Sequence, residues 1–312
     1  ELSLPATPEF PGVSGISGAL RGSRAEGVFS VRAAKSVWRW PEGWFAETEQ
    51  TFTDVVWQGR WRYDPASGYA LKTELFHAVT PEGRVTASGE LESLERPETR
   101  RVAMHAVIEA VDLARFTRYF PPAAVGQTTV DWLGRAFVQG KIPAAHLAIE
   151  GPLAAFPFRH GRGVFLVEIP VQGVTLQFDS RWPAVTIERA MVRFRNEALH
   201  IEVHDARAEK LRFAPVVATI PDLGADAPVL MVQGTVEGRW SNVLRYLVQS
   251  PLANDLPLAQ LLSWQAQGDA LLDLALTIPL SEGAVGVAGT LTLDRFSVPA
   301  AVASWPLTQG KA

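Results

Sequence analysis

The sequence predicts a mainly β protein: one long, curved antiparallel sheet with short helical pairs inserted along it. Three observations lead to this class. Short runs alternate apolar and polar side chains with a period of two, which is typical of strands with one apolar face. Gly, Pro, Asp and Asn separate the runs as turn residues. Helical spacing is confined to two regions, and these two regions resemble each other.

In the N-terminal third, aromatic residues carry the apolar face of the expected strands. A turn at 64–68 joins the run 55–63 to a second strand at 69–76, and the run 84–91 repeats the alternation. A short turn of this composition favours a hairpin. The apolar face of the first run consists of Val55, Trp57, Trp61 and Tyr63.

The central part continues the same rhythm. We expect strands at 164–171, 173–178, 189–195 and 199–203, with Asn196 and Glu197 as a turn before the last of them. A continuous antiparallel meander is the simplest arrangement of such runs.

Two pairs of helices interrupt the strands. The first pair is predicted at 112–120, ended by two prolines that cannot continue a helix, and at 129–138, with Thr128 as its N-cap. The second pair is predicted at 241–249 and 256–264.

The two helical regions indicate an internal repeat. Arg118-Tyr119 matches Arg245-Tyr246, and Pro152-Leu153 matches Pro279-Leu280, at one common offset. The strand before the helices matches with its apolar phase displaced by one residue. We therefore divide the chain into an N-terminal segment (1–101), a repeat with helices near 112–138 (102–228) and the start of a next repeat with helices near 241–264 (229–312).

Composition excludes several function classes. The net charge is −4 and the basic residues are scattered, so we expect no nucleic-acid partner. The absence of cysteine excludes disulfides, thiolate nucleophiles and Cys-ligated metals. No apolar run approaches the roughly 20 residues of a transmembrane helix. The chain begins at Glu1 and shows no signal peptide, so we interpret it as part of a longer protein.

No motif points to catalysis, a metal or a cofactor. His200 and His204 lie in a predicted strand, which places their rings on the order of 13 Å apart. They are expected to be solvated strand residues. The segment 159–163 is basic and glycine-containing, and it either contacts an anionic headgroup or, as we favour, forms a hairpin loop. A G-x-S-x-G nucleophile motif is absent.

An apolar strand face must be covered, and few helices are predicted to cover it. Packing against a second sheet is one solution. A curled meander whose apolar face lines a trough is another, and the acyl chains of a lipid would fit such a trough. The residues expected to contact acyl chains are Leu147, Ile149, Phe165, Val167, Ile169, Leu176, Phe178, Val192, Phe194, Leu199, Ile201, Leu274 and Leu276.

An ordered series of short motifs resembles the central region of YhdP-type AsmA-like proteins. The series covers roughly 102–293, and more loosely the N-terminal third. It consists of Tyr119-Phe120-Pro121-Pro122, Val130-Asp131-Trp132-Leu133, Gly140-Lys141-Ile142, Leu147–Leu153, Phe156-Pro157-Phe158, Gly163-Val164-Phe165, Trp182-Pro183, Ile220-Pro221-Asp222-Leu223 and Ser250-Pro251-Leu252.

The resemblance implies a repeating β-groove of the bridge-like lipid transfer type, shaped like a taco. Such proteins belong to the Gram-negative envelope, lie mostly in the periplasm and are anchored in the inner membrane by an N-terminal helix. They are implicated in moving phospholipid between the inner and outer membranes. The implied partners are phospholipid, the inner membrane through an anchor outside this chain, and outer-membrane or periplasmic proteins. The family offers no catalytic motif.

Two other functions stay open at this point. One is a structural envelope scaffold with a closed β-sandwich core. The other is a carbohydrate-active enzyme with carboxylates on the sheet, because carboxylates that are distant in sequence can pair in space.

Overall fold

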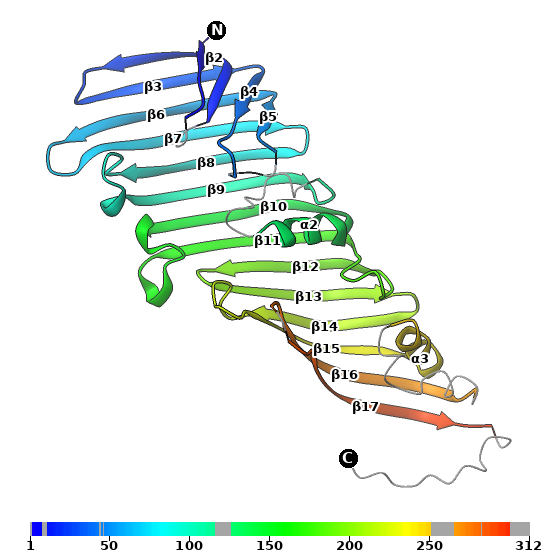
Figure 1. Ribbon diagram of the computed structural model, residues 1–312. Coiled ribbons are helices and arrows are strands. Elements are labelled where there is room, and N and C mark those ends of the chain that lie inside the picture. Colours follow the sequence, from blue (N-terminus) through cyan, green and yellow to red (C-terminus); the bar gives the residue numbers. More distant parts are fainter. Residues whose placement is uncertain are drawn as a thin grey trace.

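A computed structural model describes residues 2–7, 11–43, 45, 47–115, 126–250, 265–281 and 283–299. Seventeen strands in these ranges form one sheet, in which every pairing is antiparallel (Figure 1). The expected class is therefore confirmed. The same ranges contain two α-helices, α2 (Gln127–Ala136) and α3 (Trp240–Val248). Neither has the length and apolar character that a membrane crossing requires.

The strands follow one another along the sheet almost in chain order. β2 pairs with β3, β3 pairs with β6, and from β6 to β17 each strand pairs with the next. β1, β4 and β5 form a side branch on the first half of β2. The strands are β1 (Leu2–Leu4), β2 (Gly12–Gly22), β3 (Glu26–Ala33), β4 (Ser36–Arg39), β5 (Glu49–Phe52), β6 (Asp54–Asp64), β7 (Gly68–Thr80), β8 (Gly83–Glu92), β9 (Arg101–Asp112), β10 (Phe137–Pro152), β11 (Val164–Leu176), β12 (Val185–Arg195), β13 (Ala198–Ala208), β14 (Leu211–Ile220), β15 (Val229–Arg239), β16 (Gln267–Pro279) and β17 (Gly286–Ser297).

One central strand replaces two that the sequence suggested. The runs 164–171 and 173–178 are joined in β11, which ends at Leu176 and leaves Phe178 in the following loop. Gly173 lies in β11 with φ +58°, a conformation that glycine adopts without a steric penalty. The alternation shifts at Gly173. Val171 and Val174 are therefore both buried, although an odd spacing of three positions would place them on opposite faces of a regular strand.

The helix predictions have mixed outcomes. The helix expected at 241–249 is confirmed as α3, and the one at 129–138 as α2, which starts two residues earlier and gives way to β10 at Phe137. The residue before α2 is Gly126, so Thr128 is not its N-cap. The helix predicted at 112–120 is wrong at its start, because Asp112 ends β9 and 113–115 form a turn. Residues 116–125 and the predicted helix at 256–264 lie outside the described residues.

The register shows the one-residue displacement between the two similar regions. Ala106 of β9 is opposite Leu147 of β10, whereas Gly234 of β15 is opposite Leu274 of β16. Hydrogen bonding continues across both proposed boundaries, from β8 to β9 and from β14 to β15. The division into repeats stays a prediction, and the sheet itself is uninterrupted.

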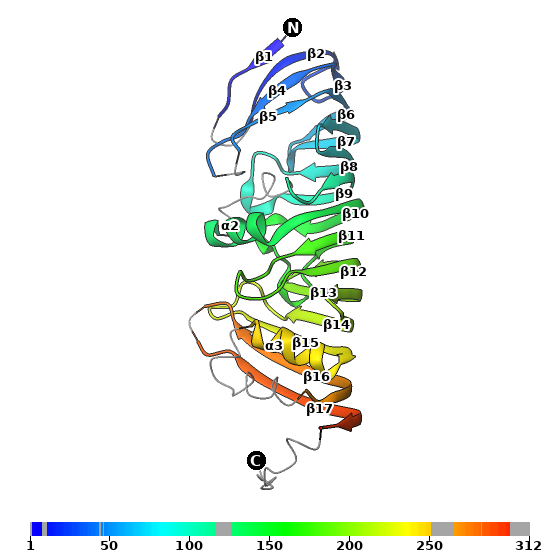
Figure 2. The same ribbon diagram turned by 90° about the vertical axis from the view of Figure 1, so that its right-hand side faces the viewer.

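The covering elements lie on one side of the sheet. Figure 2 shows α2, α3 and the β4–β5 hairpin on the same side, displaced from the row of long strands. Three buried clusters lie beneath or beside them. The first contains Ile16, Phe52 and Val55, the second Ile142, Val174 and Ile187, and the third Leu211, Val243 and Leu244. Among the described strands no separate second sheet covers this side, so the closed β-sandwich alternative is not what the structure shows.

Candidate functional site

The register brings most of the predicted apolar residues into direct cross-strand contact. Side chains directly opposite each other in an antiparallel pair lie on the same face. One row crosses β10 to β13 in this way, and a second crosses β11 to β13. One row consists of Leu147, Val167, Phe194 and Leu199, and the other contains Ile169, Val192 and Ile201.

The same rows continue to the C-terminal strands. Ile201 is opposite Ala218 in β14, Ala218 is opposite Val232 in β15, and Val232 is opposite Leu276 in β16. Leu276 is in turn opposite Val287 in β17. Predicted residues from β10–β13 and from β16 therefore share one surface, which we call the apolar face.

The rows also extend toward the N-terminus through residues that sequence reasoning did not select. This part of the row contains tryptophan and phenylalanine together with alanine. Alanine is only weakly hydrophobic, so the sequence pattern did not show that the apolar row continues through these strands. The row runs through Ala106, Ala87, Phe76, Trp57 and Val31. Phe29 and Trp57 meet edge to face, with ring centroids 5.1 Å apart.

All thirteen predicted residues are partly exposed, and none belongs to the fully buried set. Twelve lie in strands. Leu176 and Ile169 pack against the second buried cluster. Phe178 is the exception, because it lies past the end of β11 and stacks against Trp182 at 5.8 Å. It belongs to the border of the apolar face.

α3 covers one border of this face. Val243 and Leu244 are each 1% exposed and pack with Leu211, Val236 and Ala270 of the sheet. Val236 lies four residues from Val232 in β15, so the two share a face. The helix therefore covers the apolar face at the ends of its strands and leaves the remainder open.

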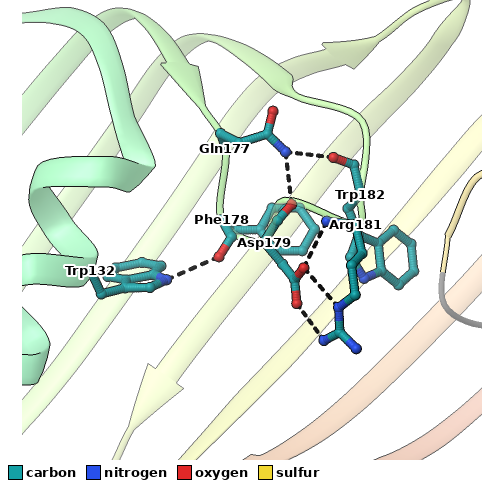
Figure 3. A network of polar contacts seen from close by, with 6 residues as sticks. All are labelled: Trp132, Gln177, Phe178, Asp179, Arg181 and Trp182. Carbon is teal, nitrogen blue, oxygen red and sulfur yellow. Dashed lines mark hydrogen bonds and ion pairs between the residues drawn. The ribbon is translucent and has the colours of Figure 1, made fainter.

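A polar network extends from α2 into the loop 177–182 along the same border (Figure 3). Trp132 of α2 donates from Nε1 to the carbonyl oxygen of Phe178, at 2.9 Å. Gln177 donates from Nε2 to the carbonyl oxygens of Asp179 and Trp182. The Trp182 ring then lies 5.7 Å from the ring of Tyr246 in α3. The loop 177–182 thus forms a continuous link between the two helices.

Charge and burial shift the pKa values of two side chains at this border, Asp179 and Tyr246. The Arg181 guanidinium, hydrogen-bonded to the Asp179 carboxylate at 2.6 Å, lowers the pKa of Asp179 below its ordinary value. Burial raises the pKa of Tyr246 to about 12, and the negative charge of Glu209 acts in the same direction.

The opposite border is made by the loop between β10 and β11, which sequence reasoning read only as a turn. Phe158 is fully buried in this loop. Its ring covers Gly151 and Gly163, where an added Cβ atom would lie 2.8 and 2.6 Å from ring carbons. Phe156 meets Phe165 edge to face, with ring centroids 5.1 Å apart. The sequence could have predicted this packing from the two glycines, Gly151 and Gly163, that flank the Phe156-Pro157-Phe158 segment.

Asn196 and Arg159 hold this loop in place. Asn196 accepts from the Phe165 backbone N–H at 2.9 Å and donates to the Phe158 carbonyl at 3.2 Å. Arg159 forms an ion pair with Asp222 at 2.7 Å. Its charge is therefore neutralised within the protein, which supports the hairpin-loop interpretation of 159–163 over a headgroup contact.

The other face of the sheet is polar. Arg193 pairs with Glu168 at 2.9 Å, and Arg62 pairs with Glu92 at 2.9 Å. His200 contacts Glu202 at 2.9 Å, while His204 is exposed further along β13. No group of three potential metal ligands occurs in the part of the chain that the structure describes. The two faces therefore differ sharply in chemistry.

Comparison with known proteins agrees with this geometry. The family model described as YhdP protein matches residues 1–306. Over 193 residues the chain is 30% identical to a protein of Escherichia coli (strain K12) named intermembrane phospholipid transporter YhdP. The match covers 62% of this chain and 15% of that protein, so the chain corresponds to a small part of its relative's length. No solved structure matches.

Proposed function

The chain belongs to the YhdP protein family, and from this premise we propose that its apolar face is a groove that holds phospholipid acyl chains. The relative's printed name describes transport of phospholipid between membranes. The proposal extends that activity to this chain as a segment of the path. The groove-lining residues would be the apolar rows from β10 to β17, together with the border residues Leu176 and Phe178.

One observation supports the proposal: the apolar rows follow one another across the sheet without interruption, and all of their named residues except Ala106 stay at least partly exposed. A soluble monomer rarely leaves so extended an apolar surface open unless that surface binds something. Acyl chains are apolar and extended, so they match such rows without requiring polar recognition. Transfer would be passive, with lipid sliding along the rows and the direction set by other components.

The cellular setting belongs to the same proposal. A protein that carries phospholipid between the inner and outer membranes must cross the periplasm, so we place this chain there. Anchoring in the inner membrane, and contact with outer-membrane or periplasmic proteins, would come from other parts of the protein. No catalytic role is assigned.

Substitution on the two faces of one strand tests the proposal. Leu276→Glu places a charge on the apolar face, and Thr277→Glu places the same charge on the polar face of the same strand. Both positions tolerate a longer side chain because neither is buried. We expect native mass spectrometry with lipid extraction to show copurified phospholipid in the wild type and in Thr277→Glu, and most of it lost in Leu276→Glu.

Thermal melting accompanies this measurement. Equal melting temperatures for the two variants would assign the loss of lipid to the groove. Absence of phospholipid from the wild-type protein, or equal lipid content in all three proteins, would refute the proposal.

A further inference from the structure

A hollow beside α3 lies outside the apolar rows. It has a volume of about 970 Å³, within the range of small-molecule sites. The strand ends of β15–β17, the turn before β14 and the outer side of α3 border it, and it is open to solvent. Its lining residues are Lys210, Glu237, Gly238, Arg239, Ser241, Asn242, Arg245, Asp269, Ala270, Leu271, Thr292 and Asp294. We call it the α3 hollow.

The carboxylates of the hollow are already paired. Glu237 contacts Arg212 at 3.3 Å, and Asp294 contacts Arg295 at 3.2 Å. Arg295 also forms an ion pair with Asp269. Neither of these arginines is among the residues that line the hollow. Arg212 and Arg295 therefore offset two of the three carboxylate charges from outside the hollow.

The cations of the hollow are unpaired by contrast. Across the described ranges, the side chains of Lys210, Arg239 and Arg245 have no carboxylate within ion-pair distance and donate no assigned hydrogen bond. All three are exposed. Ser241 and Asn242 add a hydroxyl and an amide to the lining. The hollow thus presents unneutralised positive charge together with neutral hydrogen-bonding groups.

We propose that the α3 hollow binds the phosphate of a phosphate ester through Arg239, Arg245 and Lys210. A guanidinium group binds a phosphate through two parallel hydrogen bonds, and a lysine adds a point charge. The ester is either a phospholipid headgroup or a soluble molecule such as a glycerol phosphate.

The position of α3 favours the lipid source. Trp240, Val243 and Leu244 pack on the apolar face, whereas Ser241, Asn242 and Arg245 line the hollow on the other side of the same helix. Glu237, Leu271 and Thr292 line the hollow from the polar face, so a headgroup held there would lie at the strand ends, around the sheet edge from the groove. For the lipid source, the inference rests on the proposed groove function. Phosphate binding itself does not.

The test uses a charge-matched pair of double variants. Arg239→Gln/Arg245→Gln removes two cations from the hollow. Arg189→Gln/Arg195→Gln removes two exposed arginines of β12, for which no ion pair is found in the described part of the chain. Titration calorimetry with sn-glycerol 3-phosphate measures soluble-ester binding. Flotation with phosphatidylglycerol vesicles, and with galactolipid vesicles that carry no phosphate, measures binding to lipid.

We expect the hollow variant to bind glycerol phosphate roughly tenfold more weakly or worse, since hydrogen bonds to charged groups are the stronger class. The β12 variant should bind as the wild type does. A parallel loss of phosphatidylglycerol binding would identify the headgroup as the source. Loss of glycerol phosphate binding alone would identify a soluble ester.

Unchanged glycerol phosphate binding in the hollow variant, or an equal loss in the β12 variant, would overturn the proposal. Leu276→Glu separates it from the groove function. If this variant keeps glycerol phosphate binding and loses copurified lipid, both proposals stand. If the wild type binds glycerol phosphate but carries no lipid, the groove fails and the hollow remains.

Discussion

The Phe158 side chain shows how single residues shape the border of the apolar face. Its ring lies over Gly151 and Gly163, which leave the sheet surface bare beneath it. A Cβ atom at Gly163 would lie 2.6 Å from the ring and 2.5 Å from the Glu150 carbonyl oxygen. We expect Gly163→Ala to lower the free energy of unfolding by about 1–3 kcal/mol through overpacking, measured by chemical denaturation.

Gly286→Ala is the matched control. A Cβ atom there would lie 3.4 Å from Thr277, an ordinary contact, and Gly286 is the first residue of β17, much as Gly163 directly precedes β11. We expect its unfolding free energy to stay close to that of the wild type. Equal effects of the two substitutions would mean that loss of glycine alone, and not contact with Phe158, sets the stability.

Tyr246 gives a second prediction at this scale. Its pKa is raised to about 12 in the folded protein, above the value of about 10 expected in an unfolded chain. Because the pKa is raised in the folded state, burial of neutral Tyr246 contributes fully to the free energy of unfolding below pH 10. This contribution is lost as the pH rises through 12. We expect unfolding free energy to decline by about 2–3 kcal/mol over this window.

Ultraviolet absorbance of the tyrosinate ion, combined with denaturation at each pH, measures this effect. Tyr246→Phe should remove the late-ionising component and the part of the decline that it causes. A titration of the variant that matches the wild type would show that the α3 interface does not hold this side chain neutral.

The sequence could predict which face of the sheet a side chain lies on, because successive residues of a strand point to opposite faces. Val192 and Ile201 were assigned to the apolar side in this way and are opposite each other. Phe178 was assigned to the apolar side by the same alternation but lies in a loop, because the alternation continues in sequence past Leu176, where β11 ends. Phe158 could not be found by periodicity at all, because it lies in a loop.

At the scale of elements, the loop 177–182 joins α2 and α3 and has no regular structure of its own. Gln177 provides two of its hydrogen bonds, to the carbonyls of Asp179 and Trp182. We expect Gln177→Ala to weaken the loop locally by about 1–2 kcal/mol, at roughly 1 kcal/mol per hydrogen bond. Hydrogen exchange of residues 177–182 should accelerate while the exchange of β12 is unchanged.

Gln172→Ala serves as the comparison, because Gln172 is an exposed glutamine of β11, the strand that ends directly before the loop. Its exchange pattern should match the wild type. Acceleration of the loop in both variants, or in neither, would contradict the bridging role of Gln177.

Element boundaries were less predictable than element types. The segment after 112 has helical spacing, yet β9 extends through Asp112 because β10 hydrogen-bonds to it there. That partner strand begins 25 residues later, so no local pattern reports it. α3 was predicted closely, since its apolar stripe coincides with the residues that it buries against the sheet.

At the scale of the whole molecule, the apolar face matters because it is continuous. From β3 to β17, at roughly 4.8 Å per strand, the rows extend on the order of 60 Å. Sequence predicted an apolar face on each strand but could not align the strands, because register depends on pairings between distant residues. The structure supplies that alignment, and with it a single surface in place of separate strand faces.

Photo-crosslinking on both faces tests this central claim most directly. p-Benzoylphenylalanine would replace Val192, Ile201 or Leu274 on the apolar face, and Arg193, Glu202 or Asp273, their polar-face neighbours in the same strands. The account predicts phospholipid adducts, identified by mass spectrometry after irradiation in cells, at the first three positions and not at the second three. Adducts of equal yield on both faces, or none on the apolar face, would contradict it.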